Sequence, residues 1–133
     1  DQFQASGFRA IKMKVGRSAL REDVERVRRM REHLGDDFPL MVDANAAYRL
    51  EDAAHLARLD PYDLMMIEQP LDYDDVMDHV ALQKAIATPI CLDESIHTVR
   101  IGRDAMVESG MEHGMAEGYE RLEALVATDA AAG

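Results

Sequence analysis

The sequence predicts an α/β fold made of four βα units with parallel strands, about half of a (β/α)8 TIM-type barrel, followed by an atypical helical C-terminus. Three short apolar runs each end in a carboxylate, at Asp43, Glu68 and Asp93, and these acids are spaced 25 residues apart. A period of this length indicates a repeated supersecondary unit. Strands that are almost wholly apolar and alternate with helices are typical of a parallel sheet covered by helices.

The first βα unit has the clearest pattern. In residues 8–15, apolar side chains alternate with Lys12 and Lys14, which is the period of a half-buried strand. Over residues 18–34 apolar side chains recur every three or four positions, which predicts an amphipathic helix, and Gly35 is suited to end it. The later units repeat this order, with strands expected at 40–42, 64–67 and 90–92 and helices at 50–59, 74–87 and 98–109, the second helix ending at Asp60–Pro61.

The character of the chain changes after residue 109. Glycines recur at every fourth position, 110, 114 and 118, in an acidic segment, and a helix is expected at 119–128. We therefore divide the chain into a partial (β/α) barrel domain, residues 1–109, and an atypical helical tail, residues 110–133.

Composition narrows the class of protein. The net charge of −11 argues against binding to nucleic acid or to an anionic membrane, because both need clustered cations. The single cysteine, Cys91, cannot form a disulfide within the chain, which fits a reducing, cytoplasmic setting, and we expect it to be a buried strand residue. No apolar run approaches the roughly 18 to 20 residues of a membrane span. The histidines lack metal-ligand spacing and are expected to be surface or helix-edge residues: His33, His55, His79, His97 and His113.

The predicted strand ends place charged side chains together. In a β/α barrel the functional groups lie at the carboxyl ends of the strands, so Lys14, Asp43, Glu68 and Asp93 are expected to converge on one edge. Three carboxylates need a counter-charge, and a hard divalent cation such as Mg²⁺ supplies it. Taken singly, each acid would be read as a solvated loop residue, but their equal spacing favours a common site.

The two lysines are candidates for proton transfer. Alone, a Lys-x-Lys pair on a strand is usually a solvated face. Beside a three-carboxylate metal site, a neighbouring cation and partial burial both favour the neutral amine, which is the form a general base needs. Lys12 and Lys14 are therefore expected to have a chemical role if the carboxylates hold a cation.

These stretches resemble a known family. They are similar to the barrel domain of the enolase superfamily, in the muconate lactonizing enzyme subgroup, and within it to the o-succinylbenzoate synthase / N-acylamino acid racemase family. The resemblance covers about residues 7–105, and four motifs at matching spacings carry it: Ile11-Lys12-Met13-Lys14, Val42-Asp43-Ala44-Asn45, Met66-Ile67-Glu68-Gln69-Pro70-Leu71 and Cys91-Leu92-Asp93-Glu94-Ser95-Ile96.

The resemblance implies a reaction. It implies abstraction of a proton α to the carboxylate of a small substrate with Mg²⁺, or alternatively Mn²⁺, as cofactor, followed by dehydration in the synthase or reprotonation in the racemase. It implies that Lys14 is the proton-abstracting base and that Lys12 lies beside it at the substrate carboxylate. The implied metal ligands are Asp43, Glu68 and Asp93, with Asn45 and Glu94 supporting the site.

The family pattern breaks after about residue 105. The family carries a second acid/base lysine on a later strand, whereas no lysine follows Lys84 here, so two-base racemisation by this chain alone is not expected. The alternative reading is a non-catalytic metal-binding or structural remnant of such a barrel. A receiver-like signalling domain would need paired acids after the first strand, where Lys12 and Lys14 stand instead. Half a barrel also leaves strand edges uncovered, and pairing of two copies would cover them, which makes a homodimer a hypothesis.

Overall fold

The computed structural model describes residues 7–98 and residue 100 of the 133-residue chain. The chain forms two compact units, Asp1–Ile96 and His97–Gly133, and every helix and strand described below lies in the first. The helix expected over residues 98–109, the predicted domain boundary after residue 109 and the tail over residues 110–133 fall outside the described residues, apart from residues 98 and 100. Within the described part, no helix is long and apolar enough to cross a membrane.

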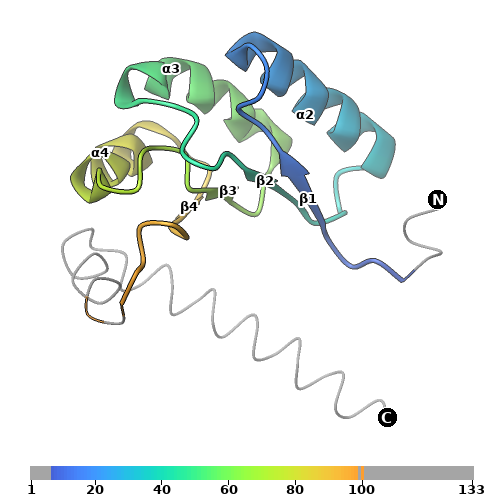
Figure 1. The fold of residues 1–133 in the computed structure, drawn as a ribbon. Helices are drawn as coiled ribbons and strands as arrows, with labels where there is room; N and C mark the ends of the chain where they lie inside the picture. The colour runs from blue at the N-terminus through green and yellow to red at the C-terminus, as the bar shows by residue number, and fades with distance from the viewer. Residues whose placement is uncertain (1–6, 99, 101–133) are drawn as a thin grey trace, which may run out of the picture. The chain divides into compact units, whose positions relative to one another are not determined.

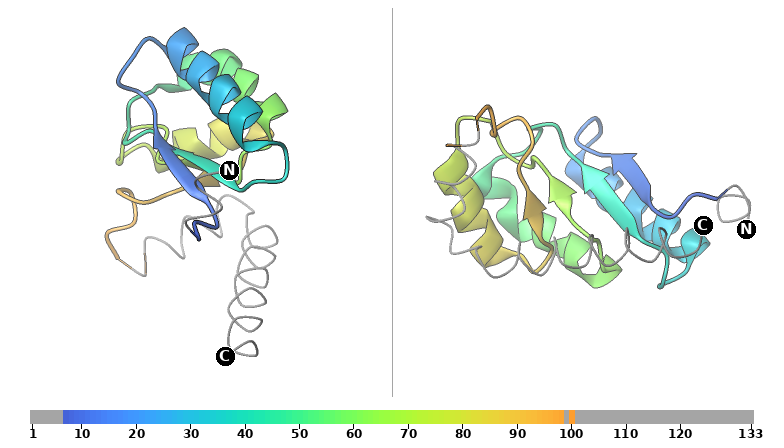
Figure 2. Two further views of the ribbon diagram at one scale, coloured as in Figure 1. Left: turned by 90° about the vertical axis from the view of Figure 1, so that its right-hand side faces the viewer. Right: turned by 90° about the horizontal axis from the view of Figure 1, so that it is seen from below.

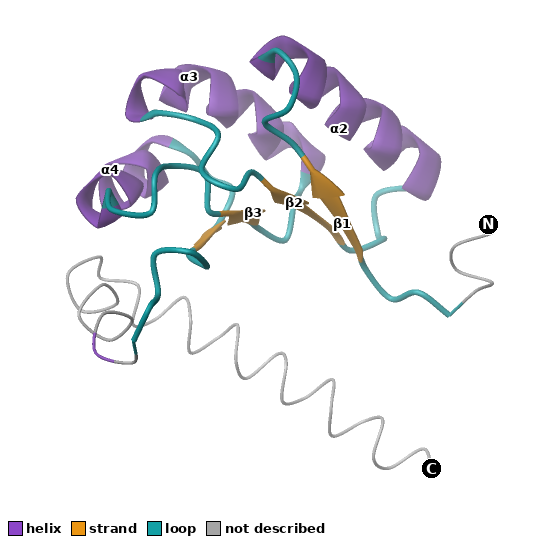
Figure 3. Cartoon of the chain, viewed as in Figure 1, coloured by secondary structure: helices purple, strands orange, loops and turns teal. Residues whose placement is uncertain are grey.

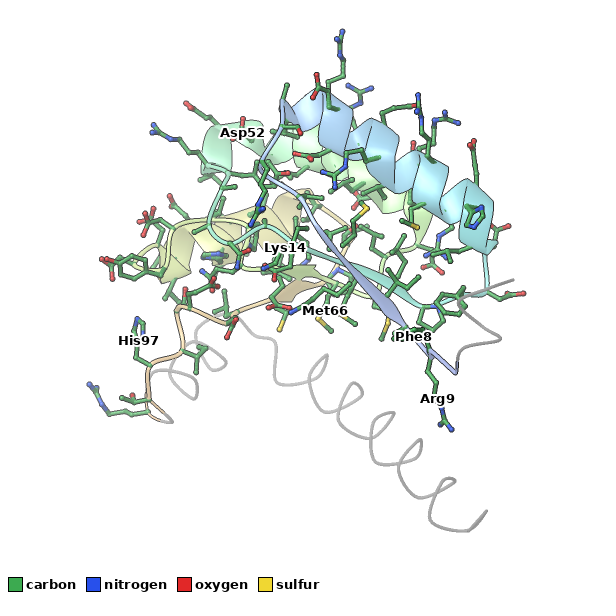
Figure 4. The ribbon with its side chains drawn as sticks, turned by 45° about the vertical axis from the view of Figure 1, so that its right-hand side comes forward. Phe8, Arg9, Lys14, Asp52, Met66 and His97 are labelled. Atoms are coloured by element: carbon green, nitrogen blue, oxygen red, sulfur yellow. The ribbon has the colours of Figure 1, made fainter. Side chains whose placement is uncertain are left out.

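The first unit is a parallel α/β arrangement, as predicted. Its strands form one four-stranded sheet in the order β1-β2-β3-β4, and each neighbouring pair is parallel. The helices lie on one face of this sheet (Figures 1 and 3). The elements, in chain order, are β1 Ile11–Lys14, α2 Leu20–Leu34, β2 Leu40–Asp43, η1 Leu50–Asp52, α3 Ala53–Leu56, η2 Ala57–Tyr62, β3 Ile67–Glu68, α4 Val76–Ala85 and β4 Ile90–Cys91.

The alternation along the strands decides which side chains face the helices. Leu40, Val42 and Ile67 are fully buried in the core between sheet and helices. Their neighbours in sequence point to the opposite face, because successive side chains of a strand alternate. No described helix covers that second face in the first unit, as the right-hand view of Figure 2 shows. Lys12 and Lys14 belong to this open face, and both are exposed.

Helix α2 forms as its apolar period predicts. Val24, Val27 and Leu34 are buried against the core, with Leu20 and Met30 packed at its margin. Gly35 ends the helix in the left-handed region, at φ 83°, and its N–H donates to the carbonyl of Arg31. Acidic side chains in the first turn and basic ones in the last complement the helix dipole.

The second helical segment differs from the prediction. Residues 50–62 form a short α-helix flanked by two 3₁₀ segments, and the expected stop at Asp60–Pro61 was wrong, because η2 includes Pro61 and continues to Tyr62. The chain leaves the helix one residue later, where Asp63 adopts φ 45°. Instead of breaking the helix, the Asp60 carboxylate accepts hydrogen bonds from the backbone N–H groups of Ala87 and Thr88 just after α4.

The third strand begins later than predicted. β3 is Ile67–Glu68, whereas a strand was expected over residues 64–67. The preceding residues still follow the sheet, since Met65 N–H donates to Leu40 O and Val42 N–H donates to Met66 O.

The prediction that the histidines are surface or helix-edge residues was wrong for His79, which is buried. This residue lies on α4 and is only 3% exposed. It is buried because both ring nitrogens find backbone partners, Leu71 N–H at 3.2 Å and Asp75 O at 2.8 Å. His33 and His97 are exposed and His55 is half-buried, while His113 lies outside the described residues. Cys91 lies in β4 as expected but is half-buried rather than buried.

Candidate active site

The register of the sheet sets three charged residues side by side. Lys14 of β1 is aligned with Asp43 of β2, and Asp43 is aligned with Glu68 of β3. Each is the last residue of its strand, so all three lie at the carboxyl edge of the sheet. Neighbouring parallel strands are about 4.8 Å apart, so long side chains on one face can meet there. We call the following residues at this edge the rim cluster: Lys12, Lys14, Asp43, Asn45, Glu68, Asp93 and Glu94.

A chain of hydrogen bonds runs along one side of the rim cluster. Lys14 Nζ donates to Asp43 Oδ2 at 2.6 Å and to Asn45 Oδ1 at 2.5 Å. The Asn45 amide then donates from Nδ2 to Glu94 Oε1 at 2.9 Å. Asn45 lies two residues beyond the end of β2 and has φ 45°, a conformation that asparagine tolerates better than most residues. Strands β1 and β2 and the loop after β4 are thereby connected through side chains.

Asp43 is the buried centre of the cluster. Its side chain is 2% exposed, and its carboxylate lies between Lys14 and the backbone N–H of Asn45. Burial would raise the pKa of Asp43, but the hydrogen bonds from Lys14 and Asn45 and the nearby lysine charges together lower it below its usual value. Asp43 is therefore a carboxylate anion that this structure keeps ionised at neutral pH.

Lys12 binds two carboxylates at once. Its Nζ lies 3.0 and 3.1 Å from the two carboxylate oxygens of Glu68 and 3.5 Å from Asp43 Oδ2. The hydrogen bonds with Glu68 outweigh desolvation, so the pKa of Lys12 is raised. Nearly half of each lysine side chain is exposed, 46% for Lys12 and 48% for Lys14, so burial is slight. With carboxylates as its neighbours, Lys12 carries a positive charge.

Asp93 stands apart from the other expected ligands. It lies in the loop two residues beyond β4 and is exposed. Among residues 7–98 and 100, no group of three or more His, Cys, Asp or Glu side chains gathers closely enough to hold a metal ion. Burial, followed by the charges of Glu68 and Asp93, raises the pKa of the Cys91 thiol, so both acids lie near this thiol. The structure brings Asp43 and Glu68 together at Lys12 and leaves Asp93 at the same edge.

The chemistry of the rim cluster suits a divalent cation. Asp43 and Glu68 already share one positive charge, and carboxylate oxygens are the ligands that Mg²⁺ prefers. A further carboxylate oxygen, Glu94 Oε2, is buried and has no hydrogen-bond partner in the described part of the chain. Asp43, Glu68 and Glu94 thus offer carboxylate oxygens of the kind that a divalent cation prefers, while the ligand set of Asp43, Glu68 and Asp93 remains a prediction.

Sequence reasoning missed a clamp behind Lys14. Asp23 of α2 is 2% exposed and accepts hydrogen bonds from Gly16 N–H, Tyr48 Oη–H and Arg26. Arg26 also donates to the carbonyl of Lys14. Burial, followed by the Asp23 charge, raises the pKa of Tyr48, so its hydroxyl remains a donor. The only sequence signal was the glycine after the strand, since an acid in a first helical turn is ordinarily exposed.

Sequence reasoning also missed a buried amide next to Glu68. Gln69 is fully buried and hydrogen-bonds to Leu71, Ser95 and the backbone of Asp93. The available signal was its position in Glu68-Gln69-Pro70, directly after an apolar strand, where a polar residue is buried only with partners.

The fold and the rim cluster define the class of this protein. Four parallel strands, joined by helices on one face of the sheet and carrying charged side chains at their carboxyl ends, are a segment of a β/α barrel. Residues 1–113 match the family model described as "Enolase C-terminal domain-like", and the chain belongs to this family. The predicted family is thus confirmed.

Known relatives agree with this assignment. The chain is 53% identical over 100 residues to an N-succinylamino acid racemase of Amycolatopsis sp, covering 75% of this chain and 26% of the relative. It is 47% identical over 106 residues to an o-succinylbenzoate synthase of Geobacillus stearothermophilus, covering 80% and 27%. A racemase from Streptomyces coelicolor A3(2), solved with bound magnesium, is similar with a TM-score of 0.74 and 46% identity, covering 83% of this chain and 33% of that one. The chain thus spans about a quarter of the length of these two curated relatives.

Proposed function

We propose that this chain supplies the cation-binding carboxylates and one base of a magnesium-dependent enzyme that abstracts a proton α to a carboxylate. The observation that carries the proposal is the rim cluster, in which two lysines of β1 meet two carboxylates on the adjoining strands. The names of the relatives, an N-succinylamino acid racemase and an o-succinylbenzoate synthase, support a small succinylated carboxylate as substrate and either racemisation or dehydration as the outcome.

Lys14 is the proposed base, and its contacts suit that role. A lysine removes a proton only as the neutral amine, which retains two N–H donors and one lone pair. Lys14 Nζ has two acceptors in the rim cluster, Asp43 and Asn45. Once Lys14 has given up one proton, its two remaining N–H groups would match these two acceptors and leave the lone pair for the substrate proton. About half of the side chain is exposed, which leaves Nζ within reach of a substrate.

Lys12 is proposed to act through its charge. The carboxylate of Glu68 raises its pKa, so Lys12 stays protonated at neutral pH. Loss of an α-proton from a carboxylate substrate creates additional negative charge on the substrate oxygens. A positive charge fixed on the same strand face as Lys14 stabilises that charge where it develops.

Asp43, Glu68 and Asp93 are the residues that would hold the divalent cation, with Asn45 and Glu94 orienting the edge of the site. When bound, such a cation supplies Lewis-acid stabilisation to the carboxylate of the substrate. The carboxylates themselves hold Lys12 and Lys14 on the open face of the sheet, so their second task is to position the two amines.

A second candidate is a non-catalytic remnant that keeps the fold of a barrel segment. One observation favours it: Lys12 pairs with both Asp43 and Glu68, so the buried charge of the rim is neutralised by the chain itself. In this reading the rim cluster contributes to stability alone, and the chain neither binds Mg²⁺ tightly nor exchanges substrate protons.

Solvent deuterium exchange separates the two candidates. The chain is incubated in D₂O with Mg²⁺ and an N-succinyl amino acid, and deuterium at the α-carbon is followed by NMR. We expect exchange in the wild type, loss of at least about 100-fold in Lys14→Ala because a general base contributes that much, and no change in Lys84→Ala, an exposed lysine of α4. Equal exchange in the wild type and Lys14→Ala, or none in either, would contradict the proposed role of this chain.

A further inference from the structure

Gln69 joins the ends of three strands through its backbone. It follows β3 directly, is fully buried and has φ 39°, a left-handed conformation that is uncommon outside glycine. Its N–H donates to Cys91 O of β4 at 2.8 Å, and its carbonyl accepts from Ala46 N–H, in the turn after β2, at 2.7 Å. A strained backbone held from both sides often marks a functional position.

The side-chain amide of Gln69 holds the loop after β4. Its Oε1 accepts from Asp93 N–H at 3.0 Å and from Ser95 N–H at 3.1 Å. Its Nε2 donates to Leu71 O at 3.1 Å and to Ser95 Oγ at 2.7 Å. Backbone N–H groups only donate and a carbonyl only accepts, so these partners fix which end of the amide faces which loop.

His79 supports the amide from α4. Its Nδ1 faces Asp75 O, an acceptor, so the proton of the neutral ring belongs on Nδ1. Its Nε2 then accepts from Leu71 N–H at 3.2 Å and lies 3.4 Å from Gln69 Nε2. Desolvation lowers the pKa of His79, which keeps the ring neutral in this arrangement. The turn that contains Gln69 is therefore tied to a helix as well as to the sheet.

The loop that Gln69 holds carries two residues of the rim cluster. The backbone N–H groups that Gln69 binds belong to Asp93 and Ser95. Glu94 lies between these two residues, and its carboxylate accepts a hydrogen bond from the Asn45 side chain. We propose that Gln69 is a positioning residue for the cation site: it sets the loop backbone from which Asp93 and Glu94 reach the rim, and it fixes the turn that carries Asn45. This role rests on the proposed function, because it assumes that the rim binds a divalent cation.

The test compares two glutamines that brace opposite ends of β4. Gln83 of α4 accepts from Ile90 N–H at 2.8 Å and donates to the carbonyls of Ile86 and Thr88, so it is a similar amide clamp away from the rim. Gln69→Met and Gln83→Met each remove a clamp with little change in side-chain volume. Mg²⁺ affinity is measured by isothermal titration calorimetry on the full chain, and stability by urea unfolding.

We expect Gln69→Met to weaken Mg²⁺ binding about 10- to 100-fold, as the loss of an orienting partner does at metal sites. Gln83→Met should lower stability but leave Mg²⁺ affinity within about twofold of the wild type, since the site it braces is elsewhere. Gln69→Glu keeps an acceptor oxygen for Asp93 and Ser95, so it should retain wild-type or tighter binding despite lower stability. It tests the same point if Gln69→Met does not fold.

Two results would overturn the inference in different ways. In the first, Gln69→Met binds Mg²⁺ as tightly as the wild type, or Gln69→Glu loses Mg²⁺ affinity in proportion to its loss of stability. Either outcome would show that Gln69 has a structural role only, and the proposed function would still stand. A wild-type chain that binds no Mg²⁺ would remove the proposed function and the positioning role together.

Discussion

Replacing Arg31 should lower the stability of this fold more than replacing any exposed charged residue of α2. Arg31 is 6% exposed although it carries a charge, and its guanidinium donates five hydrogen bonds, all to backbone carbonyls. These carbonyls lie in the loop between α2 and β2 and at the end of η2, so one side chain connects α2 to both segments at the edge of the sheet opposite the rim. The acceptors are Tyr62, Gly35, Asp36, Phe38 and Asp63.

The magnitude follows from these contacts. Each hydrogen bond contributes about 1 kcal/mol net, and leaving the buried Phe38 carbonyl unpaired adds about 1–3 kcal/mol. Water replaces part of the other four contacts, so we expect Arg31→Met to lower the free energy of unfolding by about 3–5 kcal/mol. That is a large share of the roughly 5–15 kcal/mol that stabilises a typical domain. Arg31→Lys should lose most of this too, because one ammonium cannot span five acceptors.

Urea unfolding followed by circular dichroism measures the loss. The matched control is Arg29→Met on the same helix, where the side chain is 73% exposed and forms an ion pair with Glu25, so its loss should stay below about 0.5 kcal/mol. If Arg31→Met cost no more than Arg29→Met, the reasoning that a buried guanidinium organises this end of the fold would be refuted.

Two further predictions concern a tight approach and an acid-sensitive cap. Gly16→Ala should lower the free energy of unfolding by about 3 kcal/mol, because the residue has φ 83° and an added Cβ would meet Ala47 Cβ at 2.2 Å. Gly35 has the same φ but open space around it, so Gly35→Ala should cost only about 1–2 kcal/mol. Urea unfolding measures both losses, and equal losses would contradict the role of the close approach at Gly16. Burial raises the pKa of Asp60, but hydrogen bonds from Ala87 and Thr88, just after α4, lower it by more, so the net pKa lies below the usual 3.8. In the window between its folded pKa and 3.8 the unfolded state binds more protons, so stability falls with falling pH. The Asp60→Asn variant should be less stable than the wild type at neutral pH, and its stability should depend less on pH in that acid range. If the stability of both proteins changed with pH in parallel, the titration of Asp60 would not be coupled to folding.

The sequence was sufficient to predict the sheet and part of the site. Apolar runs that end in an acid predicted parallel strands, and parallel strands in register must bring Lys14, Asp43 and Glu68 to one edge. Asp93 followed the same spacing, but it stands two residues beyond β4, where no ladder fixes the side chain. Its position depends on loop contacts that periodicity does not encode.

Buried polar residues were the part that the sequence did not reveal. The sequence analysis expected His79 at the surface or at a helix edge, and it gave no role to Arg31 or Gln69. Each is buried because its donors and acceptors meet backbone groups from distant segments. Such partners become visible only once the tertiary structure places them, and the end of η2 after Pro61 was missed for the same reason.

The most direct test of the central claim, that the rim carboxylates hold a divalent cation, is thermal unfolding with and without Mg²⁺. We predict that wild-type protein gains about 2.7 kcal/mol at an Mg²⁺ concentration 100 times the dissociation constant, because only the folded state has the site. Glu68→Gln should abolish the gain, and Glu32→Gln, on the exposed side of α2, should preserve it. A cooperative wild-type transition that Mg²⁺ does not move would contradict the claim and favour the non-catalytic remnant.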